Sequence, residues 1–260
     1  MRWLLLFCLA LYGLVDPPVT EGAVRKIDLM LEGEEMAIVF LPLANGEATL
    51  LKHASGKNVL INTGGIGTER QLKKWLDQFH VTEIDEVIVT NDEKEYVANL
   101  DWVIDTFAPE KLIVCRLKMA LPYNCEVWKE GEVHEIFPHL RAEVLCTEGD
   151  DLTFSLQYGD LRLLYMGHAS EEVEKRLLAL PLNDVNILKI AHFGLYDRPS
   201  TAFLKHVDPQ VTIFFKKRDH VPNQRLLERL YESWIDIYQT ERVGSVVVKC
   251  DLDHYEVITL

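Results

Sequence analysis

Two groups of closely spaced strand patterns, each followed by alternating strands and helices, constrain the fold of this 260-residue chain most strongly. In the first group, "MAIVFLPL" (residues 36–43), "ATLLKH" (48–53) and "NVLINT" (58–63) are separated by short turns. This spacing predicts an antiparallel meander. Apolar residues at helical spacing then predict helices over residues 68–79 and 99–107, with strands at 84–90 and 111–115.

The second half repeats this order. Residues 141–146, 152–158 and 161–166 predict another meander, and helix patterns at 170–180, 200–207 and 223–234 then alternate with strand patterns. Most of residues 116–150 have weak periodicity and several Pro and Gly residues, so we expect a loop-rich excursion there. The whole pattern predicts an α+β fold in which two sheets pack face to face, with helices on their outer faces.

The amino terminus, "MRWLLLFCLALYGLVDPP", contains an apolar run from Trp3 to Val15. This run is shorter than the roughly 20 residues that a membrane-spanning helix needs, and it fits the apolar segment of a secretory signal. We expect residues 1–22 to be a signal peptide or a membrane-anchoring leader, and residues 23–260 to form one domain. The protein is then extracytoplasmic. An apolar amino terminus packed into the core is the alternative.

Four cysteines remain after such a leader: Cys115, Cys125, Cys146 and Cys250. Outside the cytosol they could form two disulfides with three possible connectivities, or they could be buried free thiols. Their spacing is not that of a zinc ribbon or a CxxC pair, so the sequence gives no thiolate metal site.

The net charge of −14 disfavours direct binding of nucleic acid, because such binding depends on neutralising phosphates with Lys and Arg. The densest basic stretch is Lys216-Lys217-Arg218, which we interpret as a solvated turn. An apolar fraction of 48% and a charged fraction of 26% are those of an ordinary globular protein and argue against disorder.

Several short stretches resemble landmarks of the metallo-β-lactamase superfamily, whose fold is an αββα four-layer sandwich. The resemblance is closest to the extracytoplasmic hydrolase-like domain of the ComEC family of DNA-uptake competence proteins. The landmarks FLDVGQGDA, LIDTGG, THxHxDHxGG, GDA and LKVGHHGS fall in order on "FLPLANGEA" (residues 40–48), "LINTGG" (60–65), "TNDEKEYVAN" (90–99), "GHA" (167–169) and "LKIAHFGL" (188–195). This resemblance implies the sandwich fold over residues 36–260.

The same alignment implies that most ligands of a two-metal hydrolase have been replaced. Only His192 is unchanged among the metal-holding positions; the positions of the former site are Asn91, Glu93, Glu95, Tyr96, His168, His192, Phe193 and Asn62. Amide, phenyl and phenol groups are poor ligands for zinc, so the resemblance implies a degenerate site with no cofactor.

An alternative is a single divalent cation, Mn²⁺, Mg²⁺, Ca²⁺ or Zn²⁺, held by oxygen donors and one or two imidazoles. The candidate ligands are Asp92, Glu93, Glu95, His168 and His192. The plainer interpretation is that residues 92–95 form a solvated turn.

We interpret the chain as an exported, non-catalytic binding or accessory module at the cell envelope, with an unknown envelope protein or a small ligand as its partner. One alternative is a hydrolase of phosphodiester or related ester bonds that uses a rebuilt single-metal site. Another is a structural partner protein of a membrane complex. The sequence leaves the ligand, the cysteine pairing and the oligomeric state open.

Overall fold

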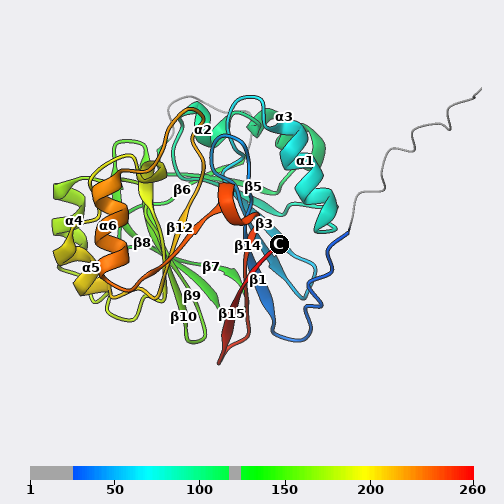
Figure 1. Cartoon of the computed structure of the whole chain (residues 1–260). Helices are drawn as coiled ribbons and strands as arrows, with labels where there is room; N and C mark the ends of the chain where they lie inside the picture. Colours follow the sequence, from blue (N-terminus) through cyan, green and yellow to red (C-terminus); the bar gives the residue numbers. More distant parts are fainter. Residues whose placement is uncertain (1–25, 117–123) are drawn as a thin grey trace, which may run out of the picture.

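The computed structural model describes residues 26–116 and 124–260, in which two β-sheets pack face to face between two layers of helices (Figure 1). The leader expected over residues 1–22 lies outside the described residues. None of the helices in the two described ranges has both the length and the apolar character that a bilayer span requires. The α+β sandwich expected from the sequence is confirmed.

The first sheet has eight strands in the order β15-β14-β1-β2-β3-β4-β5-β6. Strands β14, β1, β2 and β3 pair antiparallel, which confirms the first meander, and β3 to β6 continue in parallel. Its strands and the helices connected to them are β1 (Met36–Phe40), β2 (Thr49–His53), β3 (Asn58–Ile61), α1 (Glu69–Gln78), β4 (Glu86–Val89), α2 (Lys94–Val97), α3 (Leu100–Phe107), β5 (Lys111–Val114), β6 (Cys125–Val127), β14 (Val246–Cys250) and β15 (Tyr255–Thr259).

The second sheet has seven strands in the order β13-β12-β11-β10-β9-β8-β7. Strands β7 to β10 form an antiparallel meander, and β10 to β13 are parallel. Its elements are β7 (Val133–Phe137), β8 (Leu140–Glu148), β9 (Asp151–Tyr158), β10 (Leu161–Tyr165), α4 (Glu171–Leu177), β11 (Ile187–Lys189), the 3₁₀ turn η1 (Ala191–Gly194), α5 (Thr201–Val207), β12 (Val211–Phe214), α6 (Gln224–Glu232), β13 (Asp236–Gln239) and α7 (Thr240–Val243).

The expectation of a loop-rich excursion over residues 116–150 was wrong. Strands β6 and β7 lie within this range, and β8 fills residues 140–148. The sequence pattern misses β6 and β7 because both are short. All residues of β6 are partly buried, and β7 is exposed or partly buried over its first three residues and buried over its last two, so neither strand shows the alternation that reveals a half-buried strand.

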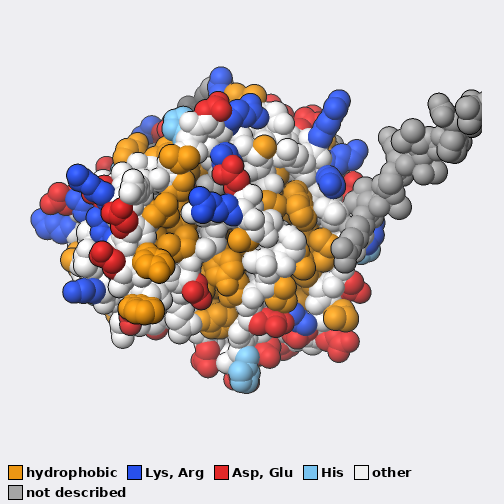
Figure 2. All heavy atoms as spheres, viewed as in Figure 1, with side chains coloured by type: hydrophobic (Ala, Val, Ile, Leu, Met, Phe, Trp, Pro, Cys, Tyr) orange, Lys and Arg blue, Asp and Glu red, His pale blue; other side chains and the backbone are white. Residues whose placement is uncertain are grey.

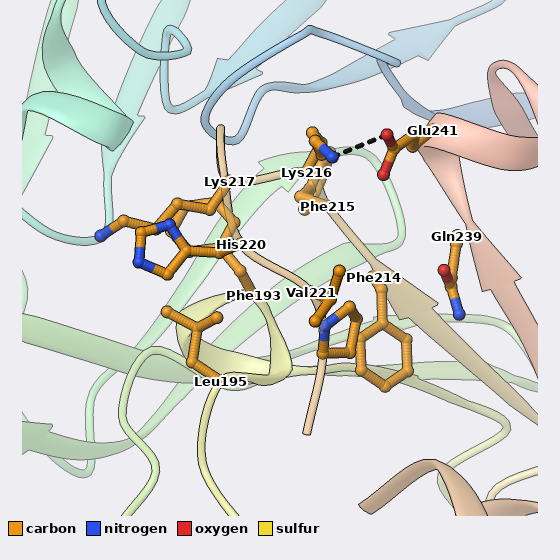
Figure 3. A pocket seen from close by; sticks show the side chains of 11 residues that line it. Phe193, Leu195, Phe214, Phe215, Lys216, Lys217, His220, Val221, Gln239 and Glu241 are labelled. Atoms are coloured by element: carbon orange, nitrogen blue, oxygen red, sulfur yellow. Dashed lines mark hydrogen bonds and ion pairs between the residues drawn. The ribbon is translucent and has the colours of Figure 1, made fainter. Parts of the chain in front are cut away.

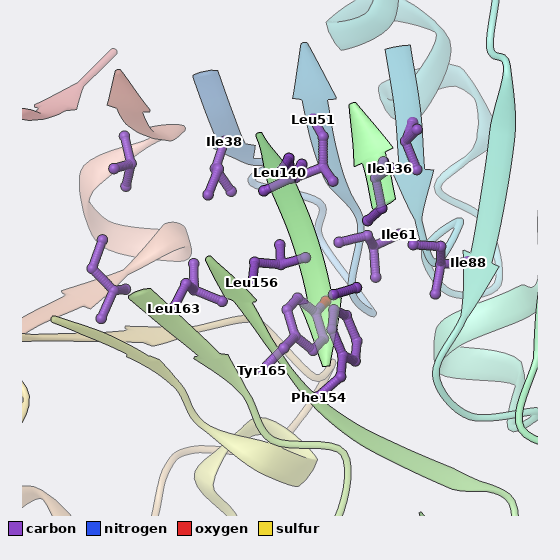
Figure 4. Packing of buried hydrophobic residues seen from close by; sticks show 14 of the residues in the cluster. Ile38, Leu51, Ile61, Ile88, Ile136, Leu140, Phe154, Leu156, Leu163 and Tyr165 are labelled. Atoms are coloured by element: carbon purple, nitrogen blue, oxygen red, sulfur yellow. The ribbon is translucent and has the colours of Figure 1, made fainter. Parts of the chain in front are cut away.

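The core has three apolar layers, which follow from the two-residue period of the strands. Along β1, Met36, Ile38 and Phe40 point into the space between the sheets, whereas Ala37 and Val39 face the helices on the other side. The middle layer is filled by interdigitating side chains such as those in Figure 4. Helices α1 and α3 cover the outer face of the first sheet, and α4, α5 and α6 cover that of the second (Figure 1).

All four cysteines between residues 115 and 250 are free thiols. Burial raises the pKa of the thiol of Cys115 to about 11, with a smaller contribution from Asp150, and raises that of Cys250 to about 12. These thiols are therefore protonated at neutral pH and act as small apolar side chains rather than as nucleophiles.

A cleft at the carboxyl ends of the parallel strands

Loops from both sheets meet where their parallel strands end. Asn62 follows β3 and Asn91 follows β4 in the first sheet, while His168 follows β10 and His192 follows β11 in the second. The Leu152 N–H donates a hydrogen bond of 2.8 Å to the carbonyl oxygen of Thr90, the residue before Asn91. This bond joins the start of β9 to the end of β4. The site residues predicted from the sequence therefore belong to both sheets and meet at one edge of the sandwich.

Asp151 is the centre of the polar cluster in this cleft. Its carboxylate accepts hydrogen bonds from the Asn91 amide and, at 2.5 Å, from Nδ1 of His168, and it lies 3.4 Å from Nε2 of His192. The two imidazole rings lie edge to face with centroids 5.0 Å apart. Burial of Asp151 opposes its ionisation, but hydrogen bonds from His192, Asn91 and His168 outweigh that effect and hold the pKa of this carboxyl below its usual value.

His192 is placed by an unusual stretch of backbone. His192, Phe193 and Gly194 have φ of 46°, 58° and 70°, three consecutive residues in the left-handed region. A side chain at the third of these positions would place its Cβ 2.3 Å from the ring of Phe214, so only glycine fits there. This turn directs His192 toward Asp151 and leaves Phe193 buried.

Tyr96 and Phe193 fill the part of the cleft where the resemblance would place two further ligands. Their ring centroids are 5.5 Å apart, and the two residues are 1% and 3% exposed. The Tyr96 hydroxyl has no hydrogen-bond partner among the described residues. Burial, followed by the negative charges of Glu47 and Asp151, raises the pKa of Tyr96 well above its usual value, so this hydroxyl stays neutral.

The carboxylates of the acidic turn after β4 do not converge with the imidazoles. Asp92 and Glu93 are exposed, and Glu95 forms an ion pair of 3.2 Å with Lys217. None of these three carboxylates belongs to the groups of potential metal ligands that converge within 4.8 Å in the described chain. The basic stretch that supplies Lys217 is neutralised in the same way, because Lys216 pairs with Glu241 at 2.6 Å.

Asn62 has a local role at the end of β3. Its side chain accepts a hydrogen bond from the Thr90 N–H at 2.9 Å and donates one to the Thr90 hydroxyl at 2.8 Å. These contacts tie the ends of β3 and β4 together without using a carboxylate. Asn62 is fully buried and has a φ of 60°, a conformation that Asn tolerates better than most residues.

A fully buried ion pair lies beneath the cleft. Nζ of Lys189 is 2.6 Å from Oε2 of Glu47, and neither side chain is exposed. The ammonium also donates to the Met166 carbonyl oxygen at 3.1 Å and lies 4.4 Å from the ring centroid of Tyr165. Burial raises the pKa of Glu47 and lowers that of Lys189, and their mutual attraction opposes both shifts.

The hollow beside Phe193 is too small for a substrate. Figure 3 shows Phe193 and Leu195 facing Phe214 and Val221 across it, with the Lys216–Glu241 ion pair above. Its volume is about 10 Å³, which corresponds to roughly one water molecule. Apolar side chains therefore close this side of the cleft.

The described residues do not fit two hydrolytic metal ions, but they include one group that suits a single ion. Ligand atoms of Asp151, His168 and His192 lie within 4.8 Å of one another, and one carboxylate with two imidazoles is a common donor set. Sequence reasoning identified both histidines but missed Asp151. A second group, at Asp251, Asp253 and His254, is a largely exposed turn in which Asp251 accepts backbone hydrogen bonds from the other two.

Comparison with known proteins places this arrangement in context. No family model matches the sequence, and no curated protein matches it either. Among solved structures, the metallo-β-lactamase fold protein YhfI from Bacillus subtilis aligns with a TM-score of 0.61 and 8% identity, over 86% of this chain and 100% of that one. Zn²⁺-bound PqqB from Methylobacterium extorquens aligns with a TM-score of 0.56 and 13% identity, over 78% of this chain and 98% of that one. At these identities the likeness shows the fold alone.

The buried ion pair between Glu47 and Lys189 leads to a prediction about the stability of the fold. Lys189→Met leaves the Glu47 carboxylate buried without its counter-ion, so we expect the free energy of unfolding to fall by about 3–5 kcal/mol. The double variant Glu47→Gln/Lys189→Met removes both charges, and we expect it to recover more than half of this loss. Urea unfolding at pH 7 measures both values. Equal losses of unfolding free energy in the single and the double variant would show that the stability does not depend on the pairing of the two charges.

Proposed function

The chain has the metallo-β-lactamase fold, and from it we propose a binding or accessory module rather than a two-metal hydrolase. The observation that carries the proposal is the packing of Tyr96 against Phe193 at 5.5 Å, with both side chains buried. A two-metal centre needs several nitrogen and oxygen donors around two ions about 3.5–4 Å apart. Here two of the positions that would face those ions hold aromatic rings that pack on each other.

We also propose that the module resembles the ComEC type and works outside the cytosol, near the cell envelope. The order of the short motifs along residues 40–195 and the apolar run from Trp3 to Val15 support this part of the proposal. Amino-terminal sequencing of the protein recovered from its native cells is the test. We expect mature protein that begins near Ala23 in the extracytoplasmic fraction. Protein beginning at Met1 and found only in the cytosol would contradict export.

The non-hydrolytic proposal is tested by restoring histidines. We expect Asn91→His/Glu93→His/Phe193→His to remain without metal-dependent phosphodiesterase activity, because Asn62, Tyr96 and His168 still differ from the family pattern. Hydrolysis of bis(p-nitrophenyl) phosphate with added Zn²⁺ or Mn²⁺ is the measurement, with the wild type assayed in parallel. Metal-dependent turnover by the wild type would overturn the proposal, and turnover by the triple variant alone would show that the site is closer to an intact two-metal site than we propose.

A second candidate function, binding of one divalent cation, is favoured by the convergence of Asp151, His168 and His192. The distance of 3.4 Å between Asp151 Oδ2 and His192 Nε2 is close to that between two ligands of one tetrahedral ion with bonds of about 2.0–2.1 Å. Metal ligands must bind in their deprotonated form, so the affinity should rise with pH. Such an ion would supply Lewis acidity at the cleft and a docking point for an anionic ligand.

A cation site at Asp151, His168 and His192 predicts one bound ion per chain. We expect Mn²⁺ or Zn²⁺ to raise the melting temperature of protein purified without chelators, and EDTA to reverse the rise. A free ion concentration of 100 times Kd would stabilise the fold by about 2.7 kcal/mol. Asp151→Asn should abolish the effect, whereas Asp253→Asn, in the exposed turn, should keep it. An equal response in both variants, or no response in the wild type, would exclude this site.

A further inference from the structure

Both ends of the Asn91 side-chain amide are held by hydrogen bonds. Its Oδ1 accepts a hydrogen bond of 2.6 Å from the Glu93 N–H, and its Nδ2 donates one to Oδ1 of Asp151. Because a backbone N–H only donates and an ionised carboxylate only accepts, these two contacts fix which atom of the amide faces which partner. Asn91 is 6% exposed, so water competes little for either bond. Asn91 therefore holds the Asp151 carboxylate in one orientation.

This orientation gives the two oxygens of Asp151 different partners. Oδ1 is engaged by Asn91, whereas Oδ2 lies 2.5 Å from Nδ1 of His168 and 3.4 Å from Nε2 of His192. While the amide holds Oδ1, the carboxylate offers only Oδ2 on the side of the imidazoles. The donors that converge there are therefore one oxygen and two nitrogens.

We propose that Asn91 is a positioning residue that makes Asp151 a one-oxygen ligand, and that the site in consequence takes Zn²⁺ or a similar transition-metal ion rather than Ca²⁺ or Mg²⁺. The inference rests on the cation site proposed above and specifies the ion. Imidazole suits zinc and its neighbours in the first transition row, whereas Ca²⁺ takes about six to eight oxygen ligands and Mg²⁺ also prefers oxygen. The carboxylates of the acidic turn after β4 do not converge with this group, so the described residues do not supply those oxygens.

Asn91 acts through Asp151 and does not itself hold the ion. Residues that orient a metal ligand by a hydrogen bond commonly change the metal affinity about 10–100-fold when they are replaced. Without the amide, the Asp151 carboxylate is free to turn and to bind an ion with both oxygens. Bidentate carboxylates and higher coordination numbers suit oxygen-preferring ions such as Mn²⁺ and Ca²⁺ better than Zn²⁺. Loss of the Asn91 amide should therefore weaken the binding of Zn²⁺ more than that of Mn²⁺.

Ion selectivity is the necessary measurement because the surface of this chain attracts cations in general. The net charge is −14, and Figure 2 shows acidic side chains gathered at the end of the molecule where the β14–β15 hairpin turns in Figure 1. Exposed carboxylates attract cations through their charge and do not require imidazole. A preference for Zn²⁺ over Ca²⁺ separates binding at the imidazoles from binding at this acidic surface.

Isothermal titration calorimetry of the full chain with Zn²⁺, Mn²⁺ and Ca²⁺ tests the role of Asn91. In Asn91→Ser the hydroxyl can still accept the Glu93 N–H and so keep the turn, but the shorter side chain loses the bond to Asp151. We expect the Kd for Zn²⁺ to rise about 10–100-fold in both Asn91→Ser and Asn91→Ala, with the Kd for Mn²⁺ changing less than about threefold. Glu93→Gln keeps the backbone N–H and changes only an exposed side chain, so this matched control should behave as wild type.

The outcomes distinguish this inference from the cation site on which it rests. A wild type that does not bind Zn²⁺ would overturn both. A wild type that binds Zn²⁺ no more tightly than Ca²⁺, or that loses Zn²⁺ and Mn²⁺ affinity equally in Asn91→Ser, would overturn only the role of Asn91. A loss confined to Asn91→Ala would also overturn it, because the amide would then serve only the turn. Circular dichroism of each variant checks that it is folded.

Discussion

The ion pair between Glu47 and Lys189 is the contact on which the geometry of the cleft depends. Glu47 lies just before β2 in the first sheet and Lys189 ends β11 in the second, so the pair fixes one sheet against the other at the end where the loops converge. Neither charge reaches solvent, and an unpaired buried charge is costly enough that the two residues must stay together. Tyr165 on β10 also contacts this pair, because its ring centroid lies 4.4 Å from the Lys189 ammonium.

Above this pair, backbone packing holds the walls of the cleft. A Cβ at Gly46 would lie 2.1 Å from the Glu95 carbonyl oxygen and 2.3 Å from the Gly65 nitrogen, so the three loops approach one another at a distance that only glycine allows. These contacts involve no metal-ligand side chain. The frame of the cleft therefore does not depend on which side chains project into it.

The sequence predicted the layers well because long meanders and amphipathic helices carry strong periodic signals, as in residues 36–63 and 141–166. It missed β13, since the four residues "DIYQ" directly follow the pattern of a helix and are too few to show a strand period. It also missed Asp151. This carboxylate reaches the cleft only because β9 runs back antiparallel to β10 and because Leu152 bonds to the end of β4. The second contact joins segments that are distant in the chain, so no local pattern could reveal it.

The two sides of the cleft differ in what a ligand would meet. On one side, Tyr96 and Phe193 bury ring surface, and burying an aromatic side chain of this kind stabilises a fold by about 1.5–3 kcal/mol, so opening this side to admit ions would be costly. On the other side, the partners of the Asp151 carboxylate among the described residues are Asn91 and the two imidazoles, whose side chains are 16–28% exposed. A small cation or a polar ligand can reach these imidazoles from solvent without disturbing the rings. The cleft is therefore accessible to a ligand at the imidazoles and closed at the aromatic side.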